Sequence, residues 1–476
     1  MASFVTDIPH RLDRLPWSRW HWTVVISLGI TWVLDGLEVT VVGAIGPRLQ
    51  EPAGLSLGAQ QIGFAATAYL LGAVAGALGF GYATDRFGRK RLFLLTLVWY
   101  LIATLLTACS WNLESFVVFR FLTGMGIGGE YAAINSTIDE LIQSSRRGHV
   151  DLAINGTWWL GTMIGSGASL LLLNPRLVDP RLGWRLAFGL GAVLALAIVA
   201  LRATVPESPR WLVLHGRREE AERVVAGIER TVENESGVRL PPVTGSLRFD
   251  PRRRGGDLAG VAQTMLRRYP QRTLLSLALM VSQAFLYNAI FFTEALVLTT
   301  FFGVPSSSVG AYIFPFAVGN LLGPLLLGPL FDRIGRRPMI AGTYIVSGIL
   351  LVATGQLFVH GVFDAKTITL AWSVIFFFAS AGASAAYLTV SEIFPVEIRA
   401  MAIAIVYAVG TLVGGAAAPA LFGLLIATKS PAAVFHGYLI GAAAMILAGI
   451  VELTIGIDAE RRLLEEIAPP LALEAG

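Results

Sequence analysis

The chain repeats a short basic turn, and each copy lies between two long apolar runs. The first copy runs from Gly81 to Arg91 and the second from Gly328 to Arg337. The glycine, aspartate and arginine positions of the two copies match at one constant offset. A basic tight turn between paired apolar segments is typical of a connection between membrane helices, and its recurrence indicates internal duplication. The sequence therefore predicts a duplicated bundle of membrane helices.

The composition agrees with a polytopic membrane protein. Of 476 residues, 55% are hydrophobic and 14% are charged, and the mean hydropathy is +0.66. A soluble protein of this length cannot bury so much apolar surface. We predict an all-α polytopic membrane protein with 12 transmembrane helices in two pseudo-symmetric six-helix halves, because this number of segments reaches the length of about 20 residues that crosses a bilayer. The segments lie at 22–46, 62–84, 91–110, 113–136, 150–173, 184–203, 273–301, 307–330, 338–359, 368–391, 400–427 and 433–456.

These segments divide the chain into three parts. Residues 1–203 form an N-terminal six-helix half, 204–272 a cytoplasmic linker with short helices, and 273–476 a C-terminal six-helix half with a short tail. In the linker, Arg217–Ser236 has helical spacing of its apolar residues and is expected to form a helix beneath the bundle. The basic run Arg252–Arg254 is expected to contact lipid headgroups.

Basic residues are distributed unevenly across the predicted membrane. Most of the 36 lysines and arginines fall on the side that holds both termini, which places both termini in the cytoplasm by the positive-inside rule. The pI of about 9.3 reflects this orientation, and we expect no nucleic-acid partner. Arginine greatly outnumbers lysine, which suggests a GC-rich bacterial genome. We therefore expect a multi-pass protein of the plasma membrane, in a bacterium the inner membrane.

The sequence offers no pattern for catalysis or metal binding. Cys109 is the single cysteine, so no internal disulfide is possible, and no Cys/His cluster suggests a metal site. No set of nucleophile, base and orienting group stands out. We expect no metal, no cofactor and no enzymatic activity.

A second internal repeat carries a family resemblance. Glu140 precedes Arg147 by the same spacing that separates Glu392 from Arg399. With the repeated turn, this pattern resembles the major facilitator superfamily over essentially the whole chain. The segment Pro206–Leu212 (PESPRWL) and the segment Ser391–Pro395 resemble the sugar porters and their neighbours, whereas Gly128–Tyr131 is more similar to the metabolite:proton symporters.

The resemblance implies a gate of ion pairs at the cytoplasmic face. One network would contain Asp85, Arg89, Glu140 and Arg147, and its twin Asp332, Arg336, Glu392 and Arg399, with Glu207 and Arg210 joining from the end of the sixth helix. These bonds would hold the cytoplasmic side closed and break in the inward-open state. The alternative is that the basic loops only fix the topology.

Carboxylates inside the apolar helices suggest ion coupling. Asp35 lies about 20 Å along the first helix, and Glu38 shares its face because the spacing is three. Burying such groups is costly unless they are paired or protonated, and Arg120 in the fourth helix is the expected cation. The resemblance to proton-coupled sugar porters implies an Asp35–Arg120 pair. In our hypothesis Asp35 binds the proton and Arg120 holds the charged form; the alternative is a static ion pair.

Three further carboxylates lie within the predicted apolar helices. Glu130, deeper in the fourth helix, is a candidate for a second proton site, a ligand for a substrate cation, or part of the inner gate. Glu294 in the seventh helix has no assigned role, and Glu452 near the inner end of the twelfth is expected to be structural.

Several positions depart from a sugar site. Where sugar porters carry a glutamine on the fifth helix this chain has Asn155, and where they carry Pro-Trp on the tenth it has Ala386 and Tyr387. Phe291 and Phe292 lie where tyrosines are expected. The predicted substrate-binding residues are Asn155, Trp158, Trp159, Gln283, Asn288 and Tyr387. Because adjacent residues diverge on a helix, the two tryptophans are not expected to face the cavity equally.

This lining of amides and aromatic faces fits an aromatic or heterocyclic ligand. An organic cation would use the rings with Glu38 or Glu130, and an organic anion would use Arg120 only if Asp35 is neutralised. We predict a secondary active transporter, a proton-coupled symporter that imports a small metabolite and works as a monomer in the lipid bilayer. The alternatives are a sugar:proton symporter, a proton-coupled exporter and a nutrient-sensing receptor. The absence of proline from residues 157–173 disfavours export, and the short tail disfavours a receptor.

Overall fold

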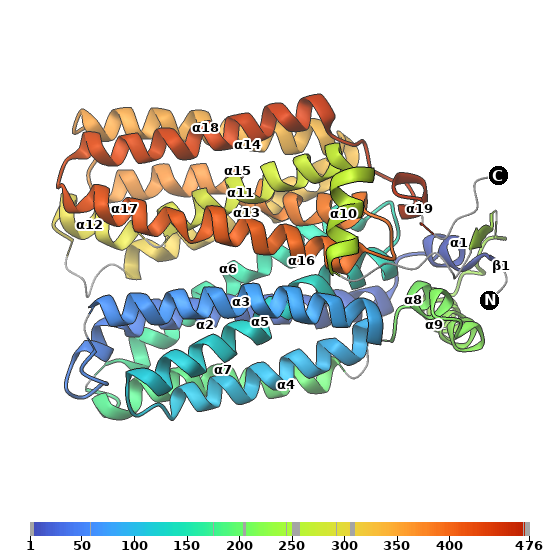
Figure 1. The fold of residues 1–476 in the computed structure, drawn as a ribbon, viewed down its shortest axis with the longest axis horizontal. Coiled ribbons are helices and arrows are strands. Elements are labelled where there is room, and N and C mark those ends of the chain that lie inside the picture. The colour runs from blue at the N-terminus through green and yellow to red at the C-terminus, as the bar shows by residue number, and fades with distance from the viewer. Residues whose placement is uncertain are drawn as a thin grey trace.

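Two bundles of long, roughly parallel helices lie side by side (Figure 1). The computed structural model describes residues 4–57, 59–174, 176–202, 206–243, 245–249, 258–291, 293–304, 310–469 and 471. The N-terminal bundle contains α2 (Arg19–Gln50), α3 (Ala59–Phe87), α4 (Arg89–Ala108), α5 (Leu113–Leu141), α6 (Arg147–Leu172) and α7 (Pro180–Arg202). The C-terminal bundle contains α11 (Pro270–Phe291), α12 (Glu294–Phe302), α13 (Gly310–Arg333), α14 (Arg336–Val359), α15 (Ala365–Ile393), α16 (Arg399–Gly410), a π-helical segment η2 (Thr411–Gly415), α17 (Ala417–Ala427) and α18 (Pro431–Ile455).

The predicted fold class, 12 membrane helices in two halves, is confirmed. Within the described residues, 8 helices are long and apolar enough to cross a membrane by length and composition alone. Large apolar side chains such as Leu170 and Leu424 are exposed on the flanks of the bundles. In a hydrocarbon environment these surfaces need no polar cover, because the helices satisfy their own backbone hydrogen bonds.

Two of the predicted helices are interrupted. The seventh, expected at 273–301, is divided into α11 and α12. The eleventh, expected at 400–427, contains the π-helical segment η2 between α16 and α17. A Cβ atom at Gly414 would overlap the carbonyl oxygen of Val281 on α11. The local widening of the helix therefore coincides with a close backbone approach between α11 and η2, which an apolar periodicity cannot reveal.

Glycines allow the repeated turns and the tightest helix contacts. Gly88 and Gly335 have φ angles of 105° and 122°, a region that favours glycine, so the tight turns predicted after α3 and α13 are confirmed. Within the N-terminal bundle, a Cβ atom at Gly124 on α5 would overlap the carbonyl oxygen of Tyr69 on α3. Small residues at such positions let membrane helices pack backbone to backbone.

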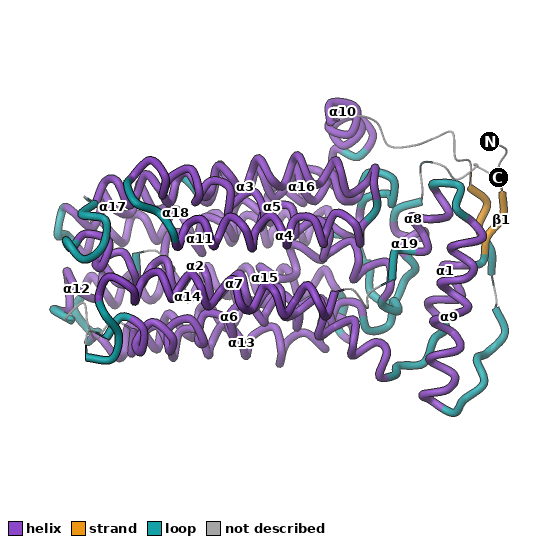
Figure 2. Tube along the Cα trace, turned by 90° about the horizontal axis from the view of Figure 1, so that it is seen from below, coloured by secondary structure: helices purple, strands orange, loops and turns teal. Residues whose placement is uncertain are grey.

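Short helices gather at one end of the molecule, which we call the terminal end (Figures 1 and 2). They are α1 (Ile8–Asp13), α8 (Pro209–Leu214), α9 (Arg218–Ser236), α10 (Leu258–Arg268) and α19 (Leu464–Ile467). The amphipathic helix predicted at 217–236 is α9, and its buried face packs against α1 and α8. Strand β1 (Phe4–Thr6) pairs antiparallel with β2 (Leu247–Phe249), an element that the sequence did not predict. The basic run Arg252–Arg254 lies outside the described residues.

Candidate transport site

A cavity of about 210 Å³ lies between the two bundles. Its walls come from α2, α3 and α6 of the N-terminal half and from α11, α15, α16 and η2 of the C-terminal half. None of the described residues that line it carries a formal charge. A ligand in this space would therefore contact both halves.

All six residues predicted to bind substrate line this cavity. They are Asn155, Trp158, Trp159, Gln283, Asn288 and Tyr387. Both of the adjacent tryptophans, Trp158 and Trp159, belong to the wall. Their rings lie 4.6 Å apart between centroids at 74° to each other, and this edge-to-face arrangement lets both contribute to the wall.

Four aromatic residues of the wall were missed from the sequence: Trp32, Tyr69, Tyr287 and Tyr407. Trp32 packs against Tyr387 of the other half with ring centroids 6.0 Å apart. It precedes Asp35 by three residues and so shares a helix face with it, a signal that could have identified Trp32. Tyr287 has a similar signal, because it follows Gln283 by four residues. Tyr69 and Tyr407 have none, because their roles depend on which side of each helix faces the other half.

The amides in the wall are partly satisfied by their own helices. The Nδ2 group of Asn288 donates to the carbonyl oxygen of Ala284 at 2.7 Å, and that of Asn155 donates to the carbonyl oxygen of Asp151 at 2.9 Å. The Oδ1 atom of Asn155 is buried and has no hydrogen-bond partner among the described residues. Because an unpaired buried acceptor is costly, this oxygen is suited to accept a hydrogen bond from a ligand.

Arg120 forms its ion pair with Glu38, and not with Asp35 as expected. Nη1 of Arg120 contacts Oε1 of Glu38, and both side chains are buried. Arg120 lies about 10 Å from the start of α5 by the helical rise. That start is at the end of the bundle opposite the terminal end, and Glu38 is one turn nearer to it than Asp35. The depth of Arg120 in the bundle therefore selects the second carboxylate.

Asp35 is buried with 4% of its surface exposed. Its Oδ1 atom has no hydrogen-bond partner among the described residues, and the carboxylates of Glu130 and Glu38 act on it electrostatically. None of the four predicted coupling residues, Asp35, Glu38, Arg120 and Glu130, lines the cavity. The structure therefore separates a neutral aromatic cavity from a charged cluster within the N-terminal half.

The predicted gate residues connect the halves reciprocally. Arg147 of α6 pairs with Glu392 of α15 at 3.5 Å, and Arg399 of α16 lies 3.9 Å from Glu140 of α5. These two ion pairs therefore join the two networks, one in each half, that the resemblance implied. Each arginine reaches across because the two halves face each other at the terminal end. All four side chains are buried.

The rest of the C-terminal network forms as the resemblance implied. Arg336 binds Asp332 at 2.6 Å and Glu392 at 3.1 Å, all within the C-terminal half. Asp332 also accepts from the backbone N–H of His149 on α6 at 2.7 Å. The side chains of Asp85 and Arg89 lie outside the described residues, so their predicted contacts are not seen.

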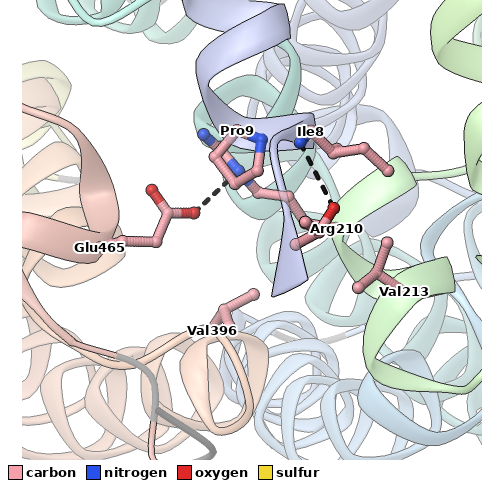
Figure 3. Close-up of a pocket in the computed structure, with 7 residues that line it drawn as sticks. Ile8, Pro9, Arg210, Val213, Val396 and Glu465 are labelled. Atoms are coloured by element: carbon pink, nitrogen blue, oxygen red, sulfur yellow. Dashed lines mark hydrogen bonds and ion pairs between the residues drawn. The ribbon is translucent and has the colours of Figure 1, made fainter. Parts of the chain in front are cut away.

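Glu207 and Arg210 lie at the same end but have different partners. The backbone N–H of Lys90 donates to Glu207 at 3.3 Å, which ties the segment after α7 to the first repeated turn. Arg210 pairs at 3.0 Å with Glu465 of the C-terminal segment, next to Ile8 and Val396 (Figure 3). Glu465 was not predicted, because nothing in the sequence shows that α19 returns to the N-terminal half.

The chain is similar in sequence to two transporters of Acinetobacter baylyi. It is 28% identical over 415 residues to the niacin transporter NiaP of Acinetobacter baylyi, covering 87% of this chain and 89% of that protein. It is also 28% identical over 356 residues to the 4-hydroxybenzoate transporter PcaK of the same organism, covering 74% of each chain.

The fold is also that of a solved transporter. The structure of the proton:xylose symporter XylE of E. coli bound to 6-bromo-6-deoxy-D-glucose superposes with a TM-score of 0.75 at 21% identity. The match covers 94% of this chain and 98% of XylE. The family model described as sugar (and other) transporter matches residues 19–468. The chain therefore belongs to the sugar (and other) transporter family, within the major facilitator superfamily.

Proposed function

We propose that this transporter imports a small aromatic or heterocyclic acid together with protons. The observation that carries the proposal is the neutral cavity of about 210 Å³ with seven aromatic side chains in its wall. Such rings stack on a planar ligand and hold it with little loss of conformational entropy. The similarity to transporters of niacin and of 4-hydroxybenzoate supports the same ligand class.

The size and polarity of the cavity restrict the ligand further. Typical ligand pockets enclose about 300–1,000 Å³, so the smaller space here favours a single-ring molecule. Gln283 and Asn288 of α11 both line the cavity. Their polar groups are suited to a ring nitrogen, hydroxyl or carboxyl group. The free acceptor of Asn155 would take a hydrogen bond from a hydroxyl or a protonated group.

We propose that Asp35 carries the coupled proton. The carboxylates of Glu130 and Glu38 act on it electrostatically, and Arg120 is already bound to Glu38. A buried carboxylate beside others of the same charge is accommodated by binding a proton. After loss of that proton, Asp35 would compete with Glu38 for Arg120. Protonation would therefore be linked to the arrangement of α2 and α5.

We further propose that the terminal end faces the cytoplasm, since the positive-inside rule favours this orientation. The contacts Arg147–Glu392 and Arg399–Glu140 would then close the cytoplasmic side and break in the inward-open state. Because both walls of the cavity come from one chain, a monomer is sufficient for transport. The membrane of residence would be the plasma membrane, the inner one in a bacterium.

The test is uptake into proteoliposomes that contain the purified protein. Radiolabelled nicotinate, 4-hydroxybenzoate and xylose are each offered with an inward proton gradient, with the gradient collapsed, and in empty liposomes. We expect uphill accumulation of at least one of the two acids that requires the gradient. Accumulation of xylose alone would support the sugar symporter instead. Accumulation that is driven by an outward proton gradient, and not by the inward one, would identify a proton-coupled exporter.

A further inference from the structure

Tyr69 contacts both the substrate cavity and the charged cluster. Its side chain lines the cavity, and the guanidinium carbon of Arg120 lies 4.3 Å from the centroid of its ring. A cation held over an aromatic face at this distance is attracted by the quadrupole of the ring. Tyr69 is thus a residue of the cavity wall that directly contacts the guanidinium of the Glu38–Arg120 pair.

Arg120 is enclosed by groups that fix its position. Glu38 binds its Nη1 atom, Tyr69 covers one part of the guanidinium, and Phe188 of α7 lies 6.0 Å from it. The side chain is only 2% exposed. A buried guanidinium held in this way moves only if one of these neighbours moves.

The backbone of Tyr69 is closely packed, so the ring is the part of this residue that can move. Its carbonyl oxygen lies where a Cβ atom of Gly124 would be, and Gly124 is one turn after Arg120 on α5. The backbones of α3 and α5 are therefore packed together at the level of the ion pair. A ligand that presses on the cavity side of Tyr69 would act through the ring and not by separating the two helices.

We propose that Tyr69 is a positioning residue that transmits occupancy of the cavity to the Glu38–Arg120 pair. A ligand stacked against Tyr69 shifts its ring and with it the guanidinium, which weakens the bond of Arg120 to Glu38 and lets Asp35 compete for Arg120. The other titratable groups around this site are Tyr100 on α4, Glu130 on α5 and Tyr407 on α16. The inference rests on the proposed function for its substrate, but the contact itself does not depend on substrate identity.

The experiment compares Tyr69→Phe, Tyr69→Leu and the parent in the full-length protein. Phenylalanine keeps the ring and should keep the parent's ratio of protons to nicotinate, measured with a lumenal pH dye and radiolabel. Leucine removes the ring. It should reduce gradient-driven accumulation roughly tenfold more than it reduces nicotinate counterflow, within the range of a desolvated cation–π contact; the counterflow of the same variant accounts for any loss of ligand binding at the cavity wall. Tyr69→Met replaces the leucine variant if that protein does not fold.

The matched control is Tyr287→Leu. Tyr287 also lines the cavity, but its ring packs on Phe376 at 4.9 Å and its hydroxyl donates to Asn320 at 3.0 Å. We expect this variant to weaken nicotinate binding and to leave the proton ratio unchanged. Equal proton ratios in Tyr69→Leu and the parent, or equal losses of coupling in both leucine variants, would overturn the proposal.

A substrate-free measurement separates this inference from the proposed function. Trp32 lies one turn from Asp35 on α2, so tryptophan fluorescence of the purified protein can be titrated with pH without any ligand. The pH at the midpoint of this fluorescence titration should shift in Tyr69→Leu and stay at the parent value in Tyr287→Leu. If the parent transports neither acid, the proposed function fails while this titration still decides the role of Tyr69. An unshifted midpoint in Tyr69→Leu then contradicts the positioning role of Tyr69.

Discussion

Replacing Arg147 with methionine should open the terminal end of the bundle. Arg147 is 1% exposed and donates to Glu392 Oε1 at 3.5 Å and to the carbonyl oxygen of Arg462 at 3.4 Å. Both partners belong to the C-terminal half, so these contacts exist only while the halves are together. Methionine keeps much of the side-chain volume and removes the charge and the donors.

The expected magnitude follows from these distances. A hydrogen bond to a charged group contributes about 1.5–3 kcal/mol at good geometry, but both contacts are at the long limit of hydrogen bonding. We therefore assign about 1 kcal/mol to each, or about 2 kcal/mol in total. Glu392 keeps its bond to Arg336, so no carboxylate is left without a partner. The ratio of closed to open molecules should fall roughly 30-fold.

Spin-label distances measure this shift. The exposed cysteine Cys109 is first changed by Cys109→Ser, and labels are attached through Ser145→Cys and Ile334→Cys, both exposed residues of opposite halves. The fraction of molecules with the longer distance should rise strongly in Arg147→Met. Arg146→Met is the matched control, because Arg146 is exposed and lies 5.2 Å from the ring of Trp17 in its own half. An unchanged distribution, or the same change in both variants, would refute the reasoning.

Three further predictions concern coupling, substrate binding and stability. Asp35→Asn should abolish gradient-driven accumulation and spare counterflow, because the side chain no longer binds and releases a proton; intact uphill uptake in vesicles would contradict the role of Asp35. Trp159→Ala should raise the apparent KM for the transported acid roughly tenfold through loss of stacking, at the upper end of the about 0.5–1.5 kcal/mol that an aromatic pair contributes. Trp111→Ala, at an exposed position outside the cavity, should leave the KM unchanged, and initial uptake rates test both. Burial raises the pKa of Glu229, but the hydrogen bonds and charges of Arg11 and Arg14 outweigh it and lower that pKa overall. The contribution of Glu229 to the stability of the folded protein is therefore fully present above the ordinary glutamate pKa of about 4.3, and it is lost as the pH falls through the lower pKa of the folded state. Glu229→Gln should lower Tm at pH 7, and this difference from the parent should disappear in acid.

Much of the fold was predictable because a membrane restricts the chain. Long apolar segments must form helices that satisfy their own hydrogen bonds, and all but the interrupted segments match a described helix within a few residues. The breaks at α12 and η2 were not predictable, since both keep the apolar composition of a continuous helix. The short strands β1 and β2 were also missed, because they form between distant segments.

Some of the cavity residues were predictable from the family pattern. The amides and tryptophans on α6 and α11 were identified by their places in the family pattern, and all of them line the cavity. Tyr69 and Tyr407 were missed because neither belongs to such a pattern. Their contribution depends on the rotation of α3 and α16 toward the space between the halves.

The sequence by itself determined the helices, the duplicated turns and the buried charges that need partners. These follow from local chemistry: apolar length, the freedom of glycine at positive φ, and the cost of a charge in hydrocarbon. The tertiary structure decided which partners meet. Arg120 binds Glu38 and Arg147 reaches Glu392 because pairing depends on the relative depth, rotation and approach of helices that are far apart in the chain. Spacing along one helix fixes only which residues share a face.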